Sequence, residues 1–66
     1  MNDLTPGQRN RLVALARAGQ PLPWGDEDPA LAAKHLVHRY RDVLDEEFAD
    51  LTGRGIAAAH AIGSQG

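Results

Sequence analysis

Proline and glycine constrain the fold of this chain more than any other feature. They divide its 66 residues into three segments that can be regular, over 6–18, 29–52 and 56–62. Pro21 and Pro23 stand between the first two segments, where they forbid helix and disfavour a central strand. The chain is therefore expected to be one small domain whose regular elements are short.

The first segment carries clear signals for a helix over 6–18. Thr5 can cap it, Pro6 suits the first helical position, and Gln8 completes a Thr-x-x-Gln capping box. Gly19 is a natural stop at the other end. Apolar side chains follow at helical spacing on the face expected to be buried, namely Leu12, Leu15 and Ala16.

The stretch between this helix and the second segment is expected to be a loop over 20–28. Trp24, the only tryptophan, lies between a proline and a glycine, and we expect it to cover the core rather than bind a ligand. Asp28 followed by Pro29 repeats the cap-plus-proline signature, which predicts that a second helix begins at Pro29.

The second segment supports two interpretations. Its apolar residues follow three-and-four spacing, which favours one long helix through 30–52 on periodicity alone. Alternatively, the helix stops near His35, and 36–43 pairs with 48–52 as a hairpin around 44–47, although that turn lacks the usual glycine. The apolar residues in question are Leu36, Val37, Tyr40, Val43, Leu44, Phe48 and Leu51.

The end of the chain is expected to be helical and then irregular. Gly53-Arg54-Gly55 interrupts regular structure, and the alanine-rich run over 56–62 predicts a closing helix that stops at Gly63. We expect a single domain over 1–62 and a disordered tail over 63–66.

Three short motifs follow one another along the chain, at 4–9, 31–37 and 51–58, and in this order they resemble those of winged-helix domains of small bacterial and phage DNA-binding proteins. Leu4-Thr5-Pro6-Gly7-Gln8-Arg9 resembles the opening of the first helix. Leu31 to Val37 (Leu-Ala-Ala-Lys-His-Leu-Val) resembles the end of a recognition helix, and Leu51 to Ala58 (Leu-Thr-Gly-Arg-Gly-Ile-Ala-Ala) resembles the passage from the second wing strand into a closing helix.

This resemblance implies an α+β fold, with helices near 6–18, 29–35 and 53–62 and a two-stranded β-hairpin wing. The alternative from periodicity is an all-α three-helix bundle with a long second helix. The sequence departs from the family pattern in two ways. His35 stands where the family usually has glycine. Only nine residues, 20–28, lie between the stop at Gly19 and Pro29, which is too few for the ordinary first helix of a helix-turn-helix.

Composition excludes several classes of function. The chain has no cysteine, so thiol nucleophiles and cysteine zinc sites are absent, and the cytoplasm is the expected compartment. No apolar run spans a membrane or forms a signal peptide. His35, His38 and Asp42 would share one face of a helix and offer a weak zinc motif, but surface histidines are the better interpretation. We therefore expect no enzyme, cofactor or metal.

Charge is arranged in stripes along the chain, whose net charge is −2. Residues 29–41 contain no acid, whereas 42–50 contain five acids and no base. The acid-free stripe predicts contacts with phosphate, and the residues expected to make them are Lys34, His35, His38, Arg39 and Arg41.

The resemblance and this basic stripe suggest a DNA-binding or transcription-associated regulatory module, acting on duplex DNA and expected to be a homodimer. The alternative is a small protein–protein interaction module or inhibitor, for example phage-encoded, that binds a protein partner through the acidic stripe over 42–50.

Overall fold

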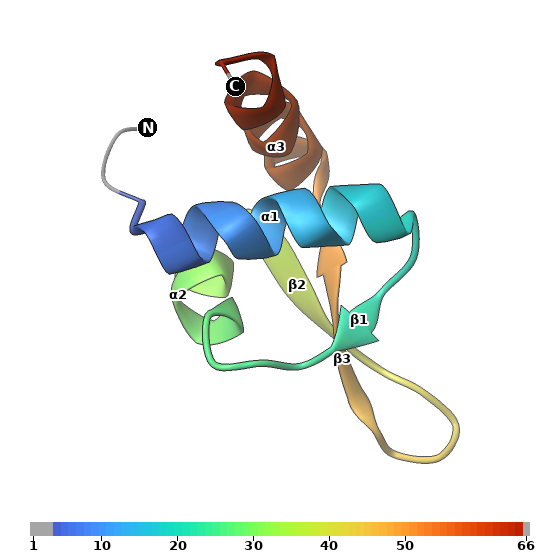
Figure 1. Ribbon diagram of the computed structural model, residues 1–66. Coiled ribbons are helices and arrows are strands. Elements are labelled where there is room, and N and C mark those ends of the chain that lie inside the picture. The colour runs from blue at the N-terminus through green and yellow to red at the C-terminus, as the bar shows by residue number, and fades with distance from the viewer. Residues whose placement is uncertain (1–3, 66) are drawn as a thin grey trace.

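The computed structural model describes residues 4–65, which form three helices and a three-stranded antiparallel sheet (Figure 1). This confirms the α+β interpretation. The elements in chain order are α1 (Pro6–Ala18), β1 (Leu22–Pro23), α2 (Asp28–Ala33), β2 (Val37–Arg41), β3 (Glu47–Leu51) and α3 (Gly53–Gln65).

The long second helix of the bundle alternative is wrong, because residues 37–51 form a β-hairpin. The three-and-four spacing that favoured a helix does not correspond to a buried stripe. Val43 is fully exposed and Leu44 is 74% exposed, whereas Val37 and Ala49 are buried. Strand alternation places the latter two on the same face of the sheet, against the helices, and that burial decides the outcome.

Helix α1 begins and ends as expected. The Thr5 side chain accepts a hydrogen bond from the Gln8 amide at 3.2 Å, and the Gln8 side chain accepts one from the Thr5 amide at 3.1 Å. At the other end Gly19 adopts a left-handed φ of 65° and donates to the Leu15 carbonyl at 3.3 Å.

Helix α2 ends in a Schellman motif. His35 takes the left-handed conformation, with φ of 62°, at the position where glycine was expected. Its amide donates to Ala32 at 3.0 Å, and the Leu36 amide donates to Leu31 at 3.0 Å. Leu31 and Leu36 are both buried in the core, as this motif favours, so the turn into β2 is fixed by backbone bonds and by apolar contact together.

The passage from β3 into α3 explains the Leu-Thr-x-x-Gly motif. The Thr52 hydroxyl donates to the His35 carbonyl at 2.6 Å and accepts from the Gly55 amide at 3.0 Å, so it joins the end of α2 to the start of α3. A Cβ on Gly55 would lie 1.8 Å from the Leu36 carbonyl oxygen. Glycine is therefore required where α3 crosses the chain entering β2.

The sheet has the order β1-β3-β2, so it contains one strand more than the predicted two-stranded wing. The extra strand falls in the segment expected to be a loop, where Leu22 pairs with Ala49 and Pro23 with Phe48. Proline is tolerated because β1 lies at the edge of the sheet, where one side of the strand needs no donor.

The core lies between α1, α2, α3 and one face of the sheet. Its buried members are Leu4, Leu12, Leu15, Leu31, Leu36, Val37, Ala49, Ala58 and Ala59. Trp24 is partly buried against this cluster, where a side chain covering the core was expected. Among the described residues, no helix is long and apolar enough to cross a membrane.

Two helix limits differ from those predicted. Helix α2 covers Asp28–Ala33 rather than 29–35, since His35 ends it early. Helix α3 passes through Gly63 to Gln65. The division into a domain over 1–62 and a disordered tail over 63–66 stays a prediction, and Gly66 lies outside the described residues.

Candidate nucleic-acid interface

A buried ion pair between α1 and α2 positions the short second helix. Arg11 meets the fully buried carboxylate of Asp28 with two nitrogens, at 3.1 Å and 2.9 Å, and also donates to the Pro23 carbonyl at 2.6 Å. The same carboxylate accepts from the Gly25 amide at 2.7 Å. We call these four residues the α1–α2 junction.

The expectation that Asp28 caps α2 is therefore wrong. The cap position is held by Glu27, which makes no side-chain capping bond, and Asp28 is the first helical residue. Its carboxylate turns to the Arg11 guanidinium because a buried carboxylate must have its charge and its oxygens satisfied. Nothing in the sequence pairs these two residues, which are 17 positions apart.

The five predicted phosphate-binding residues do not form one patch. Lys34 is half-buried at the C-terminal end of α2, and exposed His35 follows it in the turn. The other three lie on β2, where alternation sends Arg39 and Arg41 to one face and His38 to the other. The structure thus divides the stripe into three small, separate groups.

Each basic residue of β2 faces an acid within the hairpin. His38 lies 3.5 Å from Asp50, and Arg39 lies 3.3 Å from Glu47. Arg41 contacts Glu47 and the turn residue Asp45, both at 3.5 Å. The end of the basic stripe and the acidic stripe thus form the two arms of one hairpin, and antiparallel pairing places opposite charges beside each other.

Trp24 also contacts Arg39, on the face of the sheet that packs against the helices. The Arg39 guanidinium carbon lies 4.8 Å from the centre of the Trp24 ring, which is a cation–π geometry. The Trp24 amide donates to the Glu47 carbonyl at 3.1 Å. Arg39 is therefore held by a ring and a carboxylate, although about half of its side chain remains exposed.

The tip of the hairpin is ordered by Asp42 in place of the missing glycine. One oxygen of Asp42 accepts from the Leu44 amide at 2.9 Å and the Glu46 amide at 3.0 Å. Asp45, with φ of 68°, takes the left-handed position of the turn. The turn thus lies at 42–46, slightly before the predicted 44–47, because the Asp42 side chain binds two turn amides and Asp45 takes the left-handed position that glycine usually occupies.

The zinc motif considered from sequence does not assemble. His38 lies on a strand beside Asp50, His35 lies in the preceding turn, and Asp42 is engaged with the turn amides. Within residues 4–65, no group of three or more histidine and carboxylate side chains is placed to hold a metal ion.

Comparisons with known proteins support the fold. No family model and no curated protein matches the chain. Among solved structures, it is similar to MepR, a transcription regulator of the Staphylococcus aureus multidrug efflux pump MepA, with 26% identity and a TM-score of 0.78. The match covers 96% of this chain and 58% of the MepR chain. This chain is a winged-helix domain.

The second helix of the winged-helix domain, α2, has almost no side chains that can form hydrogen bonds. Of the six residues of α2, only Asp28 has a side chain with hydrogen-bonding groups, and it is fully buried. Pro29, Ala30 and Ala33 make up the more accessible side. In residues 4–65, α2 is also the only helix between β1 and β2, as the short spacing before Pro29 suggested.

Proposed function

We propose that this winged-helix domain is a DNA-binding, transcription-associated regulatory module that contacts the phosphate backbone through Lys34, His35, His38, Arg39 and Arg41. The observation that supports this most is the likeness to a transcription regulator over 96% of the chain. Side-chain exposure above one half for His38, Arg39 and Arg41 allows phosphates to approach them.

Helix α2 determines what kind of DNA binding the domain can perform. Base pairs are distinguished in the major groove by hydrogen-bonding side chains and by apolar contact with the thymine methyl group. With no accessible side-chain donor or acceptor on α2, only the apolar contact remains there. Binding through the phosphates, with weak preference among sequences, is the mode that these residues support.

The acidic side chains of the hairpin set the strength of this binding. A phosphate that reaches Arg39 or Arg41 competes with Glu47, which contacts both. These pairs are exposed and long, so each contributes little, about 0–1 kcal/mol. The exchange is therefore feasible, but affinity should be modest and should fall as salt rises.

Titration of the protein against a fluorescently labelled duplex, at low and moderate salt, tests this proposal. Arg39→Ala combined with Arg41→Ala should weaken binding to all duplexes and reduce the log–log salt slope by about one for each phosphate that the variant no longer neutralises. The matched control removes two exposed charges outside the stripe, one from α1 and one from α3, by Arg9→Ala with Arg54→Ala, and should affect binding less. Failure of the unmodified protein to bind duplex DNA at about 50 mM salt would refute the proposal.

Glu47→Gln gives a test in the opposite direction. Neutralising this carboxylate releases two arginines and removes a charge that repels phosphate, so DNA affinity should rise. Glu46→Gln is the matched control, since no ion pair of Glu46 is found among the described residues. The control should raise affinity less.

The second candidate function is capture of a protein partner by the acidic stripe. The observation that favours it is the net charge of −2, together with the 81% exposure of the Asp45 side chain. This function predicts no DNA binding at physiological salt and loss of partner capture when Asp45 and Glu46 are neutralised together.

A further inference from the structure

The tip of the β2–β3 hairpin exposes two large apolar side chains that neither proposed function uses. Val43 is fully exposed and Leu44 is 74% exposed, while Asp42 holds the turn beneath them with two hydrogen bonds. Asp45 and Glu46 follow directly and are also exposed. We call residues 43–46 the wing tip. The wing tip is thus an ordered, projecting apolar surface with two acidic side chains next to it.

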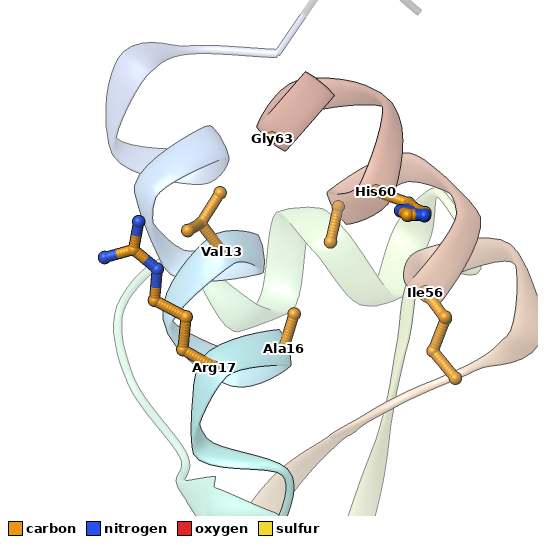
Figure 2. Close-up of a pocket in the computed structure, with 7 residues that line it drawn as sticks. Val13, Ala16, Arg17, Ile56, His60 and Gly63 are labelled. Carbon is orange, nitrogen blue, oxygen red and sulfur yellow. The ribbon is translucent and has the colours of Figure 1, made fainter. Parts of the chain in front are cut away.

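A groove between α1 and α3 is complementary to the wing tip, because it is apolar and carries a basic side chain. Its volume is about 540 Å³, and it is lined mainly by apolar or small side chains, with Arg17 and His60 as the polar members and no acid. Figure 2 shows Val13 and Ala16 of α1 lying across from Ile56 and His60 of α3. Ile56 is 58% exposed, so part of this apolar surface faces water.

We propose that the wing tip of one copy of this chain docks in the α1–α3 groove of a second copy. Leu44 would occupy the apolar groove, and Asp45 and Glu46 would lie near Arg17. Charge complementarity favours this occupant: the wing tip has two acids and no base, while the groove has a base and no acid. Within residues 4–65, Arg17 has no ion-pair partner that would compete.

The shape of the molecule allows this contact to close on itself. The domain is elongated, with extents of 38 × 20 × 18 Å, and the wing tip projects at the end away from α3 (Figure 1). Two copies lying side by side in opposite directions bring each wing tip to the other copy's groove. The result is a two-fold dimer with two equal contacts, whereas the same contact repeated head to tail would build a ring or an open fibre.

Sedimentation equilibrium of the full 66-residue chain, without DNA, tests this inference. The unmodified protein should reach the mass of a dimer, and Leu44→Asp should raise the dissociation constant roughly tenfold or more, since it places a charge in an apolar groove. Ala16→Trp should do the same by filling the groove. Circular dichroism verifies that both variants fold, and neither residue belongs to the core cluster.

A charge exchange tests the docking partners directly. Arg17→Glu and Glu46→Arg should each weaken the dimer, and the two changes together should restore it. A protein that stays monomeric at the highest concentration reached would overturn the inference, as would a dimer indifferent to Leu44→Asp and Ala16→Trp. Because no DNA is present, these results are independent of the proposed function.

Discussion

The α1–α2 junction and the hairpin use the same kinds of charged groups in opposite ways. At the junction, one arginine and one carboxylate lie 2.9–3.1 Å apart, with side-chain exposures of 20% and 0%. In the hairpin, three arginine–carboxylate ion pairs and the contact between His38 and Asp50, all at 3.3–3.5 Å, join side chains that are 31–81% exposed. Burial makes the first pair a condition of folding, and exposure leaves the others free to exchange partners with an external anion.

The largest effect is expected at the junction. Asp28→Ala leaves the Arg11 guanidinium without its counter-charge, and breaking a buried pair costs about 3–5 kcal/mol. A chain of this size is expected to have no more than about 3–5 kcal/mol in total. The variant should therefore be largely unfolded at 25 °C, as measured by circular dichroism and thermal melting.

Replacing both partners sharpens this prediction. Arg11→Met with Asp28→Leu removes the two charges together, so most of the stability should return. The hydrogen bond from the Gly25 amide to the Asp28 carboxylate is still lost, and its contribution should not return. If the melting temperature of Asp28→Ala lies within a few degrees of that of the unmodified protein, the buried pair of the junction contributes no more to stability than the exposed pairs of the hairpin.

The next effect is expected where α3 passes the start of the wing. Gly55→Ala would place a methyl group on the Leu36 carbonyl oxygen, so the backbone must shift, at an expected cost of about 1–3 kcal/mol. Gly63→Ala is the matched control in the same helix, because nothing lies within 4 Å of its Cβ position. It should stabilise the helix by about 0.5–1 kcal/mol. Equal melting temperatures for the two variants would contradict the close approach.

One left-handed residue in each region gives a third comparison. His35→Gly and Asp45→Gly both relieve a positive φ, and each should raise stability by about 1 kcal/mol in chemical denaturation. The increase at His35 should be the larger, because Asp45→Gly also removes the ion pair with Arg41 and gives a freer chain at the tip. Lower stability in His35→Gly would show that its side chain has a structural role beyond the turn.

The smallest effect is expected from the hairpin pairs. His38→Ala and Arg41→Ala should each change the free energy of unfolding by no more than about 0.5 kcal/mol, since exposed ion pairs contribute little. Arg39→Ala should cost slightly more, by about 0.5–1 kcal/mol, because this change also removes the cation–π interaction with Trp24. Changes as large as that of Asp28→Ala would remove the distinction between the two regions.

The sequence predicted the elements whose signals are local. The capping box at Thr5 and Gln8 and the stop at Gly19 depend on neighbouring residues, so α1 was predicted to the residue. The hairpin required the family resemblance, because the periodicity of 29–52 fitted a helix. In the structure the helix ends at a left-handed His35, and the chain then turns at Asp42. Neither place has the glycine that usually marks such a turn in a sequence.

Features that depend on distant partners were not predictable in the same way. Arg11 and Asp28 are joined only by the fold, so Asp28 looked like a helix cap. The basic residues Arg39 and Arg41 looked like an uncompensated stripe because their acids follow later in the chain. The predicted hairpin left Glu47 in a turn over 44–47, and only the observed register places it opposite Arg41. A pattern of charges along a chain therefore indicates a charged surface only when the strand register is known.

The proximity of Trp24 and Arg39 also makes the protein its own optical probe. Trp24 is the only tryptophan, so all indole emission comes from a single ring with a guanidinium 4.8 Å from its centre. An anion that draws Arg39 away changes the electric field at that ring, and with it the wavelength and yield of its fluorescence. Occupancy of this one arginine can therefore be followed in the unlabelled protein, separately from binding at the other basic residues.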